Sequence, residues 1–339
     1  MIKKYFISLM VSLLSVGLMA STVLAKDEVI TWKMQFTYDL ADSATLPMRY
    51  WAQEMEKLTN GRLKIQFFPP GALSPTAEVI NSLEKGVFDA AMCYGAYYTG
   101  AVPETAITTN IPMGPKTTDE AWEVWHKRGL QEILRPAFAA RNILYYMTPV
   151  DPTYVYMTKT PINKLDDLKG KKIRAVGMVG KFTQLLGAAV VNVPGPEIYM
   201  ALKLGTADGA LYSATGYKDR KLNEAAPYRA YPSLNIILTD LYINQDSIKK
   251  LPADIREILY KNTEPLLYKG GLMNAKDDEA AQVWADQNGS KRTQLSDADI
   301  KKATKLAQTL WDDIAKKNER CAKAIAIMKQ FSKEKGRLD

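Results

Sequence analysis

Two stretches of the sequence, "EVINSLEKGVFDAAMC" (78–93) and "EIYMALKLGTADGALY" (197–212), decide the fold because they align without a gap. Each predicts a helix that ends at a glycine and leads into a strand, since glycine readily adopts the left-handed conformation that ends a helix. Two copies of one helix–strand unit predict two lobes of like construction, and a chance similarity is the alternative. The identical positions are Glu78/Glu197, Leu83/Leu202, Gly86/Gly205, Asp89/Asp208 and Ala91/Ala210.

The chain around these two units alternates strands and helices. The first part predicts strands over 29–36, 62–68 and 87–94, and helices over 44–61 and 74–86, with Ser74 as N-cap of the second helix. The middle part predicts strands over 142–149, 153–159, 171–176, 189–193 and 207–213, and helices over 181–188 and 194–205. Residues 228–245 are β-rich, and the chain is helical from 251 onward. This order is typical of an α/β protein with a mostly parallel sheet covered by helices.

Length and composition favour an exported protein of two domains. A chain of 339 residues with 47% hydrophobic and 24% charged residues is globular and long for a single core. Residues 1–25 predict a signal peptide, because Lys3 and Lys4 precede an apolar run and small residues surround Ala25. An uncleaved membrane anchor is the alternative, and the run is short for one.

The residue inventory argues against most enzymes and cofactors. His126 is the only histidine, and no nucleophile–base set or phosphate loop is present, so we predict no enzyme, no cofactor and no metal centre built on His or Cys. The net charge of +8 comes from scattered lysines, so we expect no nucleic-acid partner. Pairing of Cys93 with Cys321 stays open, as does an enzyme that uses carboxylates alone.

An arginine marks the candidate binding site. In "KKIRAVGMVG" (171–180), Arg174 stands near the carboxyl end of a predicted strand, the edge where ligands of α/β folds bind. The planar fork of arginine donates two parallel hydrogen bonds to a carboxylate. Tyr94 and Tyr212 end two other predicted strands, and Tyr97 and Tyr98 follow in a candidate pocket loop. The sequence therefore predicts an anion site in a cleft, and a solvated strand end is the alternative for Arg174.

Several segments in this order resemble the DctP-type solute-binding proteins of TRAP transporters. They are the signal peptide, "GRLKIQFFPPGALSP" (61–75), "LDDLKGKKIRAVG" (165–177), "LGAAVVNVPGPEIYMALKLGTADGALY" (186–212) and "LPADIREIL" (251–259). The resemblance implies a two-lobed periplasmic binding protein fold with hinge strands and a long helix spanning both lobes. It implies that the protein captures an organic acid in the periplasm, binds its carboxylate with Arg174, and delivers it to a membrane permease.

With this resemblance the domains can be placed. We expect one lobe over 26–150 plus about 239–275 and the other over 151–238 plus about 276–339, in a protein that is a monomer. A secreted α/β enzyme and a ligand-sensing partner of a membrane receptor are the alternative functions.

This chain resembles the 2-oxo-acid branch of the family in two further segments, "AYYTGAVPE" (96–104) and "APYRAYP" (226–232). That branch has a glutamine where this chain has Tyr156, and an acidic residue and a tryptophan where it has Leu211 and Tyr212. The acidic residue helps to hold a cation there, which Leu211 cannot do, so we expect no bound metal. The changes predict a ligand that is an apolar or aromatic monocarboxylate or a 2-oxo acid. The full predicted site is Arg174, Tyr156, Tyr212, Tyr94, Tyr97, Tyr98 and Phe36.

Overall fold

The computed structural model describes residues 28–108, 111–193 and 195–338, so the predicted signal peptide lies outside the described residues. The described strands form one mixed sheet in the order β2-β1-β3-β8-β4-β7-β5-β6, with β9 paired to β8. The strands are β1 (Ile30–Phe36), β2 (Leu63–Phe68), β3 (Ala90–Cys93), β4 (Ile143–Thr158), β5 (Lys172–Arg174), β6 (Ala189–Val191), β7 (Gly209–Ser213), β8 (Tyr228–Asn244) and β9 (Lys291–Gln294).

The strand order has the same pattern read from either end. In one half β1 pairs in parallel with β2 and β3, and in the other half β5 pairs in parallel with β6 and β7. The long strands β4 and β8 lie antiparallel in the middle and run through both halves. They are therefore the segments that correspond to the predicted hinge strands.

Helices cover the sheet of each half. They are α2 (Leu46–Leu58), α3 (Val79–Glu84), α4 (Thr105–Thr108), α5 (Thr118–Trp122), α6 (Leu130–Ala139), α7 (Gly177–Leu185), α8 (Ile198–Lys203), α9 (Ala214–Asp219), α10 (Gln245–Lys249), α11 (Ala253–Gln287), α12 (Asp297–Ala315) and α13 (Glu319–Glu334). Short helical turns include η1 (Ser43–Thr45), η2 (Thr76–Glu78), η3 (Gly95–Tyr98), the π-helical η4 (Glu123–Lys127) and η6 (Gly195–Glu197). Among the described helices, none is both long and apolar enough to cross a membrane.

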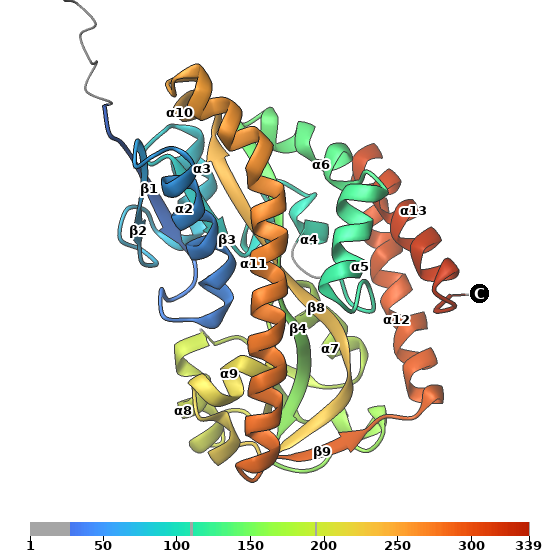
Figure 1. Ribbon diagram of the computed structural model, residues 1–339. Helices are drawn as coiled ribbons and strands as arrows, with labels where there is room; N and C mark the ends of the chain where they lie inside the picture. The colour runs from blue at the N-terminus through green and yellow to red at the C-terminus, as the bar shows by residue number, and fades with distance from the viewer. Residues whose placement is uncertain (1–27, 109–110, 194, 339) are drawn as a thin grey trace, which may run out of the picture.

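The helix α11 ties the two halves together. It runs the length of the molecule and packs against α2 of one half and α9 of the other (Figure 1). Gly270 and Gly271 let α11 approach α2 and β4 closely, because a Cβ there would lie 2.6 Å from the Pro47 Cα of α2 and 2.7 Å from the Pro149 Cγ of β4. The long helix that the sequence predicts therefore contacts both lobes.

The repeated helix–strand units take equivalent places in the two halves. They are α3 with β3 and α8 with β7, and the glycine after each helix has a positive φ, 71° at Gly86 and 78° at Gly205. The aligned residues Leu83 and Leu202 are both fully buried. The repeat in the sequence therefore corresponds to a repeat in the structure.

Several details differ from the expected elements. The strand β9 interrupts the part of the chain that is predicted to be helical, and α7 begins at Gly177 instead of residue 181. The predicted strands 142–149 and 153–159 form the single strand β4, whose pairing with β8 shifts register between Val150 and Tyr154. The C-terminal helices pack on both halves. The start of α12 shares a core with Ile173 and Phe182, whereas Cys321 and Met328 of α13 share a core with the first half. The lobe boundaries stay a prediction. The packing of α13 bears on the expected assignment of residues 276–339 to the second lobe.

Candidate functional site

A cavity of about 580 Å³ lies between the halves, where the parallel strands of both end. Most of its lining residues come from the carboxyl ends of strands β1 to β3 and β5 to β7 and from the segments that follow, as expected for a ligand site in an α/β fold. Tyr154 of β4, Ile237 of β8 and Arg220 after α9 complete the wall. They are Thr37, Tyr38, Asp39, Asp42, Pro70, Thr76, Tyr94, Tyr97, Tyr154, Arg174, Val176, Asn192, Val193, Gly195, Tyr212, Ser213, Arg220 and Ile237.

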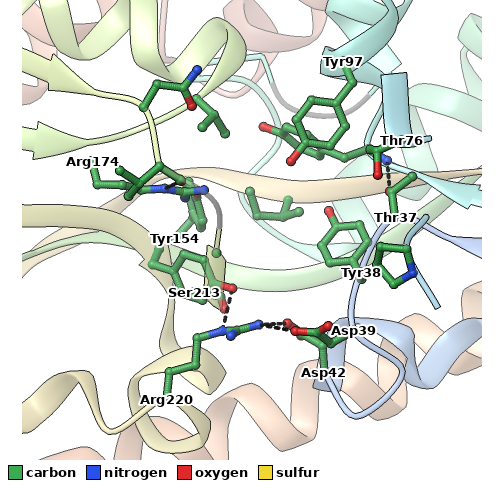
Figure 2. A pocket seen from close by; sticks show the side chains of 18 residues that line it. Thr37, Tyr38, Asp39, Asp42, Thr76, Tyr97, Tyr154, Arg174, Ser213 and Arg220 are labelled. Atoms are coloured by element: carbon green, nitrogen blue, oxygen red, sulfur yellow. Dashed lines mark hydrogen bonds and ion pairs between the residues drawn. The ribbon is translucent and has the colours of Figure 1, made fainter. Parts of the chain in front are cut away.

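Arg174 is the uncompensated charge of this cavity. It ends β5, its side chain is 4% exposed, and its Nε donates to the Val193 carbonyl at 3.0 Å. No carboxylate among residues 28–108, 111–193 and 195–338 forms an ion pair with it. Figure 2 shows the guanidinium pointing into the cavity, and its central carbon lies 5.7 Å from the centroid of the Tyr212 ring. A buried arginine with free terminal N–H groups can take a carboxylate as its partner.

A second arginine, Arg220, bridges the two sides of the cavity. It follows α9, and it forms ion pairs with Asp42 at 3.1 Å and Asp39 at 3.5 Å, which both follow β1 (Figure 2). Its Nε also donates to the Tyr212 hydroxyl at 3.1 Å. Burial raises the pKa of this hydroxyl, so Tyr212 stays protonated and neutral. Arg220 is therefore occupied by groups of the protein itself.

Tyrosine rings form much of the remaining wall. Tyr94 packs edge-to-face against Tyr38, with ring centroids 6.5 Å apart, and against Tyr97, at 5.4 Å. On the opposite side, the rings of Tyr154 and Tyr212 lie 6.4 Å apart. Such rings offer flat apolar surface with a hydroxyl at the edge. The wall suits a ligand with an apolar or aromatic body.

The structure brings four of the predicted residues together, Arg174, Tyr94, Tyr97 and Tyr212, at this cavity. Tyr97 is 49% exposed, which places it at the rim, whereas Tyr94 is 5% exposed.

Three predicted residues do not line the cavity. Tyr156 pairs with Leu211, deeper in its lobe than the Tyr154–Ser213 pair, and its hydroxyl is bonded to Thr183 of α7 at 2.9 Å. It is 1% exposed and does not line the cavity, whereas Tyr154, two positions earlier in the same strand, does.

Tyr98 and Phe36 belong to the core of the first half. Tyr98 is 2% exposed, its hydroxyl donates to the Thr76 carbonyl at 2.8 Å, and its ring packs edge-to-face on Tyr97, with centroids 6.3 Å apart. Phe36 is fully buried and packs edge-to-face on Phe67, with ring centroids 5.2 Å apart. Both are predicted from the sequence to contact the ligand, and neither lines the cavity, because both pack in the core.

Sequence reasoning missed most of the cavity lining, including the large or charged residues Tyr38, Tyr154, Asp42 and Arg220. Tyr38 and Asp42 follow the first predicted strand, so a search of every strand end would have included them. Tyr154 stands in the predicted strand 153–159, two positions from the residue that was chosen. Arg220 has no local signal, because only the tertiary fold places it opposite Asp42.

The cation that the resembling branch holds does not fit the residues at this site. Leu211 offers no ligand atom and is fully buried, and the Tyr156 hydroxyl is already bonded to Thr183. Within the described part of the chain, no group of three or more His, Cys, Asp or Glu side chains could hold a metal ion. Cys93 and Cys321 are free and buried, so they form no disulfide with each other.

Comparison with known proteins places this geometry in a family. Residues 41–318 match DctP, the bacterial extracellular solute-binding protein family 7. A solute-binding protein of Albidiferax ferrireducens is 30% identical over 84% of this chain and 85% of its own length. A monocarboxylate 2-oxoacid-binding periplasmic protein of a Nostoc species is 28% identical over 90% of this chain and 85% of its own length.

A solved structure shows the same fold. The TRAP periplasmic solute-binding protein of Rhodoferax ferrireducens, crystallised with bound malonate, is 26% identical and has a TM-score of 0.76. The likeness covers 89% of this chain and 98% of that one, which confirms the predicted two-lobed α/β fold. The chain therefore belongs to the DctP family of periplasmic TRAP solute-binding proteins, which bind a solute and catalyse no reaction, as the sequence predicts.

Proposed function

We propose that the protein binds a monocarboxylate with an apolar or aromatic body, or a 2-oxo acid, in the cavity between its lobes. The observation that carries this proposal is Arg174, a buried guanidinium that faces the cavity and pairs with no carboxylate of the described residues. Tyr94, Tyr154 and Tyr212 supply aromatic wall, and Ile237 adds apolar surface. The volume of about 580 Å³ falls in the range of about 300–1,000 Å³ that is common for small-molecule sites.

The relatives support an acid as the ligand. The Nostoc protein is named for monocarboxylate 2-oxoacids, and the Rhodoferax protein holds malonate. In this chain the carboxylate would bind Arg174, and the body of the acid would lie against the tyrosines. Membership of the family also implies delivery of the ligand in the periplasm to a TRAP permease.

Capture would involve closure of the lobes around the acid. The strands β4 and β8 are the connections that would bend, and a ligand that contacts both lobes favours the closed state. We propose lobes as predicted from the sequence, except that α13 belongs with the first lobe, because Cys321 and Met328 pack in its core. We expect the protein to act as a monomer.

Calorimetry against a panel of acids tests the ligand class. The panel contains aromatic, 2-oxo and C4 dicarboxylic acids, titrated into protein that has been unfolded and refolded to remove ligand carried through purification. We expect the tightest binding from aromatic monocarboxylates or 2-oxo acids. Tight binding of succinate without binding of any aromatic or 2-oxo acid would refute the proposal.

Replacement of the guanidinium tests the site itself. Removing one partner of a buried charged pair costs about 2–5 kcal/mol, so Arg174→Ala should lower the affinity for the acid by at least about thirtyfold. Arg174→Lys should retain part of the affinity, because it keeps the charge but loses the two-pronged fork. Arg256→Ala, a half-buried arginine of α11 that does not line this cavity, is the matched control and should bind normally. Unchanged affinity in a folded Arg174→Ala protein would exclude Arg174 as the carboxylate ligand.

A further inference from the structure

The two arginines of the cavity are in opposite electrostatic situations. Arg174 and Arg220 both lie against one ring, with their central carbons 5.7 Å and 5.8 Å from the centroid of Tyr212. One ligand in the cavity is therefore within reach of both. Within the described parts of the chain Arg174 has no acidic partner, whereas Arg220 has two, Asp42 and Asp39.

We propose that Asp42, by pairing with Arg220, restricts the cavity to acids that carry a single charge. The inference deepens the proposed function and rests on it. A diacid that binds Arg174 through one carboxylate would bring its second carboxylate into a cavity whose other cation is already neutralised. The second carboxylate would also face the negative charges of Asp42 and Asp39, and like charges brought together in an interface disfavour the wrong partner.

The pair is held in place from both sides. Asp42 is the N-cap of η1 and accepts a hydrogen bond from the Ala44 N–H at 3.0 Å, which fixes the carboxylate at the cavity wall. Arg220 is fixed by the Tyr212 hydroxyl. The side chain of Asp42 is 12% exposed and that of Asp39 is 50% exposed, so Asp42 is the stronger partner of Arg220.

One more acid lies near the pair. Asp219 precedes Arg220 in the chain but does not line the cavity. Burial first, and then the charge of Asp42, raise the pKa of the Asp219 carboxyl. Asp42 is therefore the main acid that neutralises Arg220 within the cavity, and Asp39 contributes less.

The test is to free Arg220 and to measure the preference between acids that differ by one carboxylate. Asn is as good an N-cap as Asp, so Asp42→Asn keeps η1 capped while it removes the charge. Calorimetry compares butanoate with succinate, hexanoate with adipate, and phenylacetate with 1,4-phenylenediacetate. The wild type should prefer the monoacid of each pair that binds. In Asp42→Asn the ratio of diacid to monoacid affinity should rise at least about tenfold, which is 1.4 kcal/mol.

Three further variants make the result specific. Asp39→Asn changes the net charge by the same amount as Asp42→Asn, and it should raise the ratio of diacid to monoacid affinity less. The double variant Asp42→Asn/Arg220→Gln should not show the higher ratio of Asp42→Asn, because it lacks the guanidinium of Arg220. Asp42→Ser, also a good N-cap, gives a second measurement should Asp42→Asn fold poorly.

The outcomes separate this inference from the proposed function. It is overturned by an unchanged ratio in Asp42→Asn, by a lower monoacid affinity without a gain for diacids, or by an equal gain in Asp39→Asn. A wild type that binds diacids as tightly as monoacids also overturns it, while binding of organic acids through Arg174 still stands. If the wild type binds no carboxylate and Arg174→Ala changes nothing, both proposals fail.

Discussion

Gln35 in the first lobe and Arg174 in the second occupy the same position of the fold. Gln35 of β1 pairs with Ala91 of β3, and Arg174 of β5 pairs with Ala210 of β7. Ala91 and Ala210 are aligned residues of the sequence repeat. The two side chains are also equally hidden, at 0% and 4% exposure.

The two side chains differ in how many of their polar atoms form hydrogen bonds within the protein. The Gln35 Oε1 accepts from the Leu73 and Ser74 N–H groups, both at 2.8 Å, and its Nε2 donates to the Ser74 carbonyl at 2.6 Å. Arg174 makes the corresponding contact to the loop after β6, at Val193, with its Nε alone. Gln35 therefore has a structural role, whereas Arg174 keeps terminal N–H donors that the proposed ligand would use. Equivalent positions of the two lobes can therefore hold a loop in one lobe and face the proposed binding site in the other.

Replacement of Gln35 gives the strongest test of this difference in roles. Gln35→Ala leaves the N–H and carbonyl groups of Ser74 buried and the N–H of Leu73 half-buried, all without partners, and each buried group costs about 1–3 kcal/mol. We expect the free energy of unfolding to fall by about 3 kcal/mol, measured by urea denaturation. Arg174→Ala is the matched control and should lose about 1 kcal/mol, since one hydrogen bond is removed. Equal losses in the two variants would contradict the division of roles.

The contrast between these two residues also shows what the sequence can predict. The repeat, the strand ends and the guanidinium of Arg174 are local features, so they could be predicted from pattern alone. The role of Ser74 could not. The sequence predicts it as an N-cap, but its backbone is bound by Gln35, and the helical turn η2 begins at Thr76. That contact joins residues far apart in the chain, which no local pattern reveals.

The tyrosines of the site illustrate the same limit. Tyr154 and Tyr156 share one predicted strand, and only the pairing of β4 with β7 shows that Tyr154 lies at the edge of the cleft, opposite Ser213. Tyr97 and Tyr98 are neighbours, and only the turn of η3 decides which ring faces the cavity. The ends of strands could therefore be predicted. How deep a residue of a strand lies in its lobe, and which way a side chain in a turn points, depend on tertiary contacts.

A second pair of equivalent positions holds an acid in one lobe and an apolar residue in the other. Asp240 of β8 pairs with Cys93, and Val155 of β4 pairs with Tyr212, which is aligned with Cys93 in the repeat. Asp240 is fully buried, and its Oδ2 accepts from the Thr108 and Tyr242 hydroxyls, both at 2.6 Å. Burial raises the pKa of Asp240 to about 7. A buried carboxyl with a pKa this high makes folding depend on pH.

The sign of this dependence follows from the proton uptake. In the unfolded chain the carboxyl has a pKa of about 3.9, so between about pH 4 and pH 7 the folded protein binds more protons, and stability falls as pH rises. From pH 5 to pH 7 the wild type should lose about 2 kcal/mol relative to Asp240→Asn, measured by urea denaturation at each pH. Burial also raises the pKa of Asp278, to about 6, but that group is present in both proteins and cancels. Parallel stability curves for the two proteins would contradict an ionisation of Asp240 in this range.

The smallest expected difference concerns the aligned acids Asp89 and Asp208. Each accepts a hydrogen bond from the backbone of the neighbouring strand, Asp89 from the Lys33 N–H at 2.8 Å and Asp208 from the Lys172 N–H at 2.9 Å. Asp89 accepts a second one, from the Ser247 hydroxyl at 2.6 Å.

The two acids therefore differ by one hydrogen bond, and the stability of two alanine variants should show it. We expect Asp208→Ala to lower the free energy of unfolding by about 1 kcal/mol and Asp89→Ala by about 2 kcal/mol, measured by urea denaturation. Ser247→Ala should remove most of the excess, so that adding Asp89→Ala to it costs about as much as Asp208→Ala alone. If the two single variants lose the same free energy, the contact with Ser247 contributes nothing, and the duplicated acids are equivalent in energy as well as in position.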